Sequence, residues 1–126
     1  MISQQHHLNI CNMEDLYKFG YTGQSDVKSR FKYNVDVIFS WWLPYEMAYL
    51  GEQLLLAAIK KDFYLVEQLD GITEMRKFTT AEKDHITTSL YSVKDDFVKK
   101  FPQFKVDKPW DLKWKKLYFV KVLNNG

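Results

Sequence analysis

The segment 45–63 places the strongest constraint on the fold. It is rich in Ala and Leu, contains one Gly and no Pro, and follows Pro44, so the sequence predicts a helix there. A second helix is predicted from Thr79 until Pro102 ends it, because Thr79 and Glu82 have the spacing of a capping box. Apolar residues recur along this second segment at helical spacing: Ile86, Leu90, Val93 and Phe97.

The remaining segments predict short strands around a third helix. A helix is expected from Ser25, which is a suitable N-cap, to about Tyr33. The runs that favour extended structure are residues 8–12, 16–21, 35–42 and, after a turn, the end of 71–78. Together these elements predict an α+β fold, in which a small three-stranded antiparallel sheet is flanked by helices.

Composition limits the class of protein further. The length of 126 residues suits one compact domain, and an apolar content of 46% excludes a wholly disordered chain. The single Cys11 cannot form a disulfide within the chain. The sequence has neither an apolar run of about 18 residues, which a membrane span needs, nor the pattern of a signal peptide. We therefore expect a protein of a bacterial or host-cell cytoplasm with no membrane partner.

Positive charge is concentrated in residues 99–126, which hold eight lysines and two aspartates. Aromatic rings are interleaved with these lysines, and a nucleic-acid surface needs both cations for phosphate and flat rings for stacking. Alternatively, the rings pack on the core and the lysines form a solvated outer face. We expect 99–126 to be a helical, basic and aromatic C-terminal extension packed on a domain formed by 1–98. From Trp110 onward a strand is also possible, because Trp110, Trp114 and Tyr118 share a helical face whereas Tyr118 to Leu123 has a β-like pattern. The residues predicted to bind nucleic acid are Lys108, Lys113, Lys115, Lys116, Trp110 and Trp114.

Two charged residues fall on apolar helix faces. Glu52 lies in the middle of the apolar sector of the 45–63 helix, and Arg30 lies beside Val27 and Phe31 on the shorter helix. A charge in a core-facing stripe is costly unless it is paired, neutralised or bound to a metal. The two residues therefore form either a partly buried salt bridge or a polar pocket, in which Arg30 binds an anion and Glu52 binds a metal.

The order of these elements resembles the GIY-YIG nuclease superfamily. The similarity is greatest to the phage and viral subgroup whose second motif is Lys-Ile-Gly-x-Thr, which stands here as Lys18-Phe19-Gly20-Tyr21-Thr22. Arg30 and Glu52 match the Arg and the helix Glu of that subgroup, and Gly71-Ile72-Thr73-Glu74 resembles its downstream element. The resemblance implies catalytic roles for Lys18, Arg30 and Glu52, with Glu52 as metal ligand. It implies supporting roles for Gly20, Thr22 and Glu74.

The resemblance implies an endonuclease that hydrolyses DNA with one Mg²⁺ or Mn²⁺. The first family motif has no clear match, since Leu8-Asn9-Ile10 contains no tyrosine, and Leu56 stands where the subgroup often has a histidine. His6 and His7 are alternative sources of a general base. The other function left open is a catalytically inactive module of the same fold, which binds nucleic acid or, through exposed aromatic residues, a protein that it inhibits or recruits.

Overall fold

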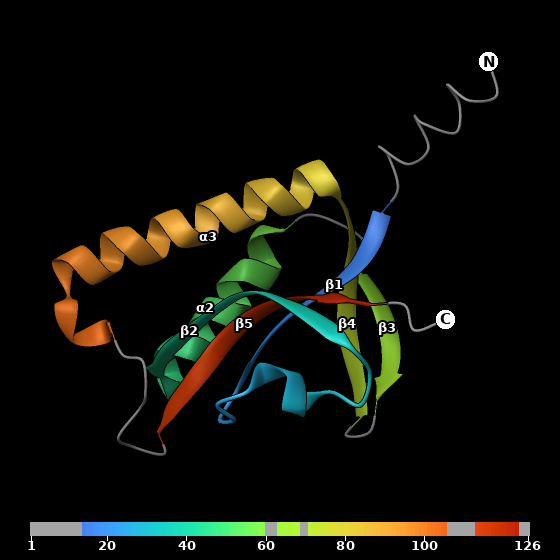
Figure 1. Ribbon diagram of the computed structural model, residues 1–126, viewed down its shortest axis with the longest axis horizontal. Helices are drawn as coiled ribbons and strands as arrows, with labels where there is room; N and C mark the ends of the chain where they lie inside the picture. The colour runs from blue at the N-terminus through green and yellow to red at the C-terminus, as the bar shows by residue number, and fades with distance from the viewer. Residues whose placement is uncertain (1–13, 60–62, 69–70, 106–112, 124–126) are drawn as a thin grey trace.

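The computed structural model describes residues 14–59, 63–68, 71–105 and 113–123, and the side chains within 63–68 and 71–74 and that of Glu14 lie outside the description. Five antiparallel strands form one sheet in the order β2-β5-β1-β4-β3 (Figure 1). The elements in chain order are β1 (Glu14–Thr22), the 3-10 turn η1 (Val27–Arg30), β2 (Val35–Pro44), α2 (Tyr45–Ala58), β3 (Phe63–Gln68), β4 (Gly71–Thr79), α3 (Thr80–Lys100), the 3-10 turn η2 (Pro102–Phe104) and β5 (Trp114–Val122).

The sheet confirms the α+β class but not the predicted strand number. The described residues form five strands, where three were expected. The helical C-terminal extension is also wrong for the described residues, because Trp114–Val122 is a strand that pairs with both β1 and β2. The alternating pattern of this segment, in which Leu117 and Phe119 face one side and Tyr118 and Val120 the other, suits a strand buried on both faces.

The two helices cover one face of the sheet. Tyr17 and Phe19 of β1 join Leu117 and Phe119 of β5 in the core on this side, and partly buried residues of α2 and α3 pack over them. Phe19 stacks on Phe119 with ring centroids 4.5 Å apart. Figure 1 shows α3 along one side of the sheet and η1 on the side away from it.

The opposite face carries a smaller core that includes η1. Val27 of η1 is buried with Val35, Tyr118 and Val120, and Phe31 contacts the Tyr118 ring edge-on. The helix predicted from Ser25 to Tyr33 is therefore shortened to a single turn. Asp26, rather than Ser25, is its N-cap and accepts a hydrogen bond from the backbone N–H of Lys28.

For the two long helices, the predicted first residues agree with the structure better than the predicted last residues. α3 begins with the predicted capping box, in which the Thr79 hydroxyl accepts from the Glu82 N–H and the Glu82 carboxylate accepts from the Thr79 N–H. α2 ends at Ala58 instead of Phe63, which opens β3. The strands expected at 16–21 and 35–42 are confirmed within β1 and β2, whereas the strand expected at 8–12 lies outside the described residues.

Candidate nucleic-acid interface

Lys18, Gly20 and Thr22 lie on the face of β1 that η1 covers. Neighbouring residues of a strand point to opposite faces, and Phe19 lies in the core under the helices. Gly20 is opposite Tyr118, and a Cβ atom at Gly20 would overlap the Tyr118 hydroxyl. The need for glycine at this position therefore has a packing explanation. The buried Thr22 hydroxyl accepts a hydrogen bond from the Gln24 N–H at 3.2 Å, which shapes the turn after β1.

Arg30 and Glu52 are carried by elements on opposite faces of the sheet. Arg30 is the last residue of η1, on the same side as Lys18. Glu52 is a half-buried residue of α2, whose Tyr45 and Tyr49 pack against the Tyr21 ring on the other side. The structure therefore brings Lys18 and Arg30 to one face but does not bring Glu52 to them. The same placement argues against the Arg30–Glu52 salt bridge.

Tyr21, the tyrosine within the second motif, is held in its neutral form. A hydrogen bond with Tyr45 is the largest influence, followed by burial and the negative charge of Glu52, and together they raise the pKa of Tyr21 to about 12. A general base is most effective when its pKa lies near the working pH. Tyr21 is therefore poorly suited to accept a proton at neutral pH.

The surroundings of Glu52 do not form a metal-binding cluster in the part of the chain that the structure describes. Its Oε1 accepts a hydrogen bond from the Gln53 amide at 3.1 Å. Among the described residues, no group of three or more His, Cys, Asp or Glu side chains is placed to hold a metal ion. Mg²⁺ prefers several oxygen ligands in a near-octahedral arrangement. The observed donors do not fit such a site, and a metal at Glu52 stays a prediction.

Some of the predicted residues fall wholly or in part outside the described residues. Lys108 and Trp110, together with His6 and His7, lie outside the described residues. Glu74 is paired with Leu65 in the β3–β4 hairpin, but its side chain is also outside the description.

The remaining predicted lysines lie at the start of β5. Lys113 is exposed, whereas Lys115 and Lys116 are half-buried. Lys116 donates from Nζ to the Ser25 carbonyl at 3.0 Å and lies over the Trp42 ring, 5.5 Å from its centroid. This cation is thereby held in one position beside an aromatic ring.

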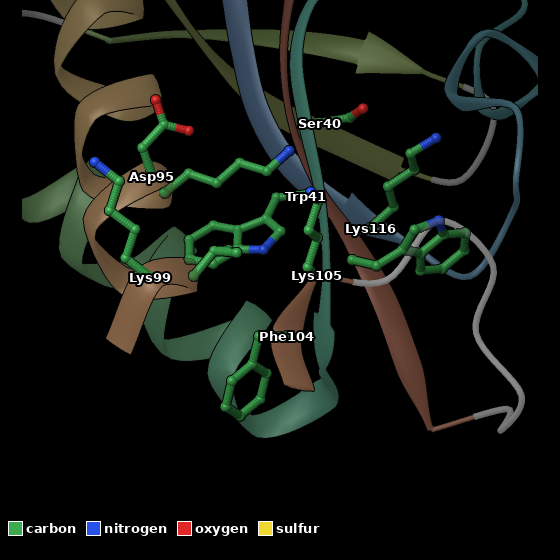
Figure 2. Close-up of a pocket in the computed structure, with 10 residues that line it drawn as sticks. Ser40, Trp41, Asp95, Lys99, Phe104, Lys105 and Lys116 are labelled. Carbon is green, nitrogen blue, oxygen red and sulfur yellow. The ribbon is translucent and has the colours of Figure 1, made fainter. Parts of the chain in front are cut away.

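Lys116 is one of four lysines that line a groove at the outer strand of the sheet. We call it the basic groove; it has a volume of about 510 Å³ and lies between β2, α3 and η2. In Figure 2, Asp95 and Lys99 project from α3 on one side, Ser40 and Lys116 lie on the other, and Phe104 is below. The groove is lined by Ser40, Trp41, Trp42, Lys94, Asp95, Val98, Lys99, Phe104, Lys105 and Lys116.

The charge of the basic groove comes mainly from residues outside the predicted set. Lys94 and Lys99 are on α3, and Lys105 follows η2. Among the described residues that line the groove, the charged ones are four lysines and Asp95. The α3 residues lie at i, i+1, i+4 and i+5, which is one face of a helix. On a helical wheel of α3, Lys94, Asp95 and Lys99 lie on one charged face, so their shared position can be recognised from sequence.

Two further hollows lie nearby. An apolar groove of about 510 Å³ separates α2 from α3 above the sheet, with Phe39, Leu43 and Leu117 among its lining residues. Another hollow has a volume of about 500 Å³. It is lined by Pro44, Tyr45, Glu46, Lys113 and Trp114. We call the latter the Tyr45–Trp114 pocket.

Comparison with protein family models, with curated proteins and with solved structures found no match to this chain. No helix in the described part of the chain is both long enough and apolar enough to cross a membrane.

Proposed function

We propose that this protein is a nucleic-acid-binding module that holds a sugar-phosphate backbone in the basic groove. The observation that carries the proposal is the composition of that groove, in which four lysines face one aspartate beside the indole rings of Trp41 and Trp42. Lysine ammonium groups that neutralise phosphates release bound counterions, and this release is a main source of affinity for nucleic acids.

The surroundings of the cations support a chain of phosphates as the ligand, whereas the rings of Phe39, Trp41 and Trp42 are themselves buried. Lys94 lies over the Phe39 ring, with Nζ 5.8 Å from the centroid, and Lys116 lies over Trp42. These rings hold the ammonium groups at the edge of the sheet without neutralising them. Proteins that bind single strands combine such cationic tracks with aromatic rings on which bases stack.

Binding of this kind requires neither a metal nor the convergence of Lys18, Arg30 and Glu52. The nuclease activity implied by the GIY-YIG resemblance stays a prediction, as does a protein partner. The nuclease would nick plasmid DNA in the presence of Mg²⁺ and lose this activity in Glu52→Ala and Arg30→Ala. Absence of nicking at high protein concentration with Mg²⁺ or Mn²⁺ would rule it out.

Salt-dependent binding tests the proposed function. A fluorescently labelled single-stranded oligonucleotide is titrated with protein at several salt concentrations, and anisotropy gives the affinity. Each phosphate contact in a single strand contributes a slope of about −0.7 to the plot of log affinity against log salt. The triple variant Lys94→Ala, Lys99→Ala, Lys105→Ala should therefore flatten the slope by about 2.

The matched control removes lysines outside the groove. Lys28 and Lys32 are exposed and lie on or beside η1, on the other side of the sheet from α3. Lys28→Ala with Lys32→Ala should leave the slope close to that of the parent. If the control variant flattened the slope as much as the groove variant, binding would not be specific to the basic groove. Truncation of 99–126 is not a suitable test, because it removes the inner strand β5.

A further inference from the structure

The Tyr45–Trp114 pocket is joined to the basic groove by a pair of aromatic rings. Phe104 lines the basic groove and Trp114 lines the pocket, and their ring centroids are 6.2 Å apart. Along β2, Trp42 lines the groove and Pro44 lines the pocket, two residues further on. Described residues that line the two hollows are therefore neighbours in the structure.

The backbone fixes the two aromatic walls of the pocket relative to each other. The Tyr45 N–H donates to the Lys113 carbonyl at 2.8 Å, which ties the start of α2 to the residue before β5. Trp114 is paired with Pro44 across the strands. Tyr45 is 46% exposed and Trp114 is half-buried. Aromatic surface is therefore accessible to a ligand in the folded protein.

The charge of the pocket differs from that of the basic groove. Among the described residues, Glu46 and Lys113 are the charged residues that line the pocket, and both are exposed. Within this described lining one carboxylate stands beside one ammonium, whereas lysines outnumber the aspartate in the described lining of the basic groove. A carboxylate repels phosphate, but it accepts hydrogen bonds from the exocyclic amino group of a base such as cytosine.

We propose that the Tyr45–Trp114 pocket is a nucleobase subsite for the strand whose phosphates lie in the basic groove. The inference rests on the proposed function and names the ligand more closely as single-stranded nucleic acid. The base stacks against the aromatic wall formed by Tyr45 and Trp114. The Glu46 carboxylate accepts a hydrogen bond from an exocyclic amino group. The pocket therefore favours cytosine over thymine, which has no such amino group.

Three oligonucleotides of equal length separate the contributions of base and backbone. They are oligodeoxycytidine, oligodeoxythymidine and an abasic strand with the same phosphates, each titrated at neutral pH. We expect the abasic strand to bind about tenfold more weakly than oligodeoxythymidine, because stacking is lost. We expect oligodeoxycytidine to bind about fivefold more tightly than oligodeoxythymidine, because of the added hydrogen bond.

Three side chains that are exposed provide the variants, and Tyr45→Phe keeps the contact of the Tyr45 ring with Tyr21 that Tyr45→Ala removes. Glu46→Ala should reduce the ratio of cytidine to thymidine affinity to about one, because it removes the acceptor. Asp96→Ala, on the exposed surface of α3, also removes one negative charge and should leave the ratio unchanged. Tyr45→Ala should weaken thymidine binding but not abasic binding, whereas Tyr45→Phe should retain both.

The outcomes distinguish this inference from the proposed function. Equal affinity for all three strands, with the salt dependence intact, would overturn the nucleobase subsite and leave the basic groove as a backbone site. A ratio that is unchanged in Glu46→Ala would overturn the role of the carboxylate. Failure of all three strands to bind would overturn the proposed function itself.

Discussion

The basic groove and the apolar groove have the same volume, about 510 Å³, but opposite chemistry. α3 forms one wall of each, and Trp41 contributes to both. The face of α3 toward the basic groove carries Lys94, Asp95 and Lys99. The face toward the apolar groove carries residues such as Ile86, Leu90 and Phe97, and no Lys, Arg, Asp or Glu is among the described residues that line it.

The difference shows that shape alone does not indicate what a groove binds. Side chains four residues apart repeat on one face of a helix, so a single 21-residue helix presents two unrelated surfaces. A phosphate backbone needs the charged surface. Among the described residues, the apolar surface, where Leu54 of α2 is 68% exposed, offers a ligand no Lys or Arg. Substitutions on the two sides should therefore affect different measurements.

The largest expected effect comes from the residue that the two grooves share. Trp41 is only 9% exposed and contacts Phe97 with ring centroids 5.5 Å apart. Trp41→Ala should lower the free energy of unfolding by about 3–5 kcal/mol, because it leaves a large cavity. Urea denaturation measures this loss, and we expect the variant to lose oligonucleotide affinity as well.

Trp41→Phe is the matched control for that cavity. Within the described structure, the buried Trp41 Nε1 has no hydrogen-bond partner. Replacement by phenylalanine therefore removes volume but no hydrogen bond, and the loss of stability should be smaller than for alanine. An equal loss in both variants would show that the indole nitrogen has a partner in solution.

Charge reversal in the basic groove should be the next largest effect. Lys94→Glu with Lys99→Glu should lower the affinity for a single-stranded oligonucleotide by about a hundredfold at low salt. Stability should change by less than about 1 kcal/mol, since Lys99 is exposed and Lys94 loses only its contact with the Phe39 ring. Anisotropy measures the affinity and urea denaturation measures the stability. If the double variant were unfolded, the two lysines would be needed for stability as well as for binding.

Alkaline pH should act on the helix-covered core below the apolar groove. Burial first, and then the negative charge of Asp15, raise the pKa of Tyr17 to about 12. The fold therefore favours neutral Tyr17, and its contribution to stability is complete below pH about 10 and is lost as the pH rises toward about 12. At pH about 11, the expected loss is about 1.4 kcal/mol.

The Tyr17→Phe variant isolates this ionisation, because other tyrosines also titrate at high pH. Its stability, measured by urea denaturation at pH about 8 and about 11, should fall less than that of the parent by roughly the same 1.4 kcal/mol. A parallel fall in the two proteins would show that Tyr17 does not contribute to the pH dependence.

The smallest expected effect comes from an exposed residue of the apolar groove. Leu54→Gln should change stability by about 0.5 kcal/mol or less, because the side chain is already exposed. It should not alter oligonucleotide affinity, whereas fluorescence of an apolar dye bound in this groove should decrease. A loss of oligonucleotide affinity would mean that the ligand extends across α3 into the apolar groove.

The parts of the fold that could be predicted from sequence depend on local interactions. The capping box of Thr79 and Glu82 joins residues three apart, and both hydrogen bonds are present at the start of α3. Pro44 similarly marks the boundary between β2 and α2. By contrast, η1 remains a single turn because Phe31 adopts an extended conformation and packs on Tyr118, a residue of the distant strand β5.

The candidate site was less predictable, because it depends on strand order. Lys18 and Glu52 fit motifs in the sequence, but Lys18 lies on the face of β1 that η1 covers, whereas α2, which carries Glu52, packs on the opposite face of the sheet. Lys116 was predicted as a site residue and Lys99 belongs to the same basic segment 99–126, whereas Lys94 of α3 lies before that segment. Trp110 and Trp114 share a helical face on a wheel, so periodicity alone did not identify β5, and the pairing of β5 with β1 and β2 decided it.

The inner position of β5 has a consequence for the order in which the protein folds during synthesis. β1 and β2 are separated by β5, and β5 supplies buried side chains to the cores on both faces. A nascent chain that ends before Trp114 therefore contains a β3–β4 hairpin joined to β1, but its β2 has no strand to pair with. The sheet closes only when residues 114–122 have left the ribosome. Until β5 is in place the basic groove lacks Lys116, so this groove is completed only when the sheet closes.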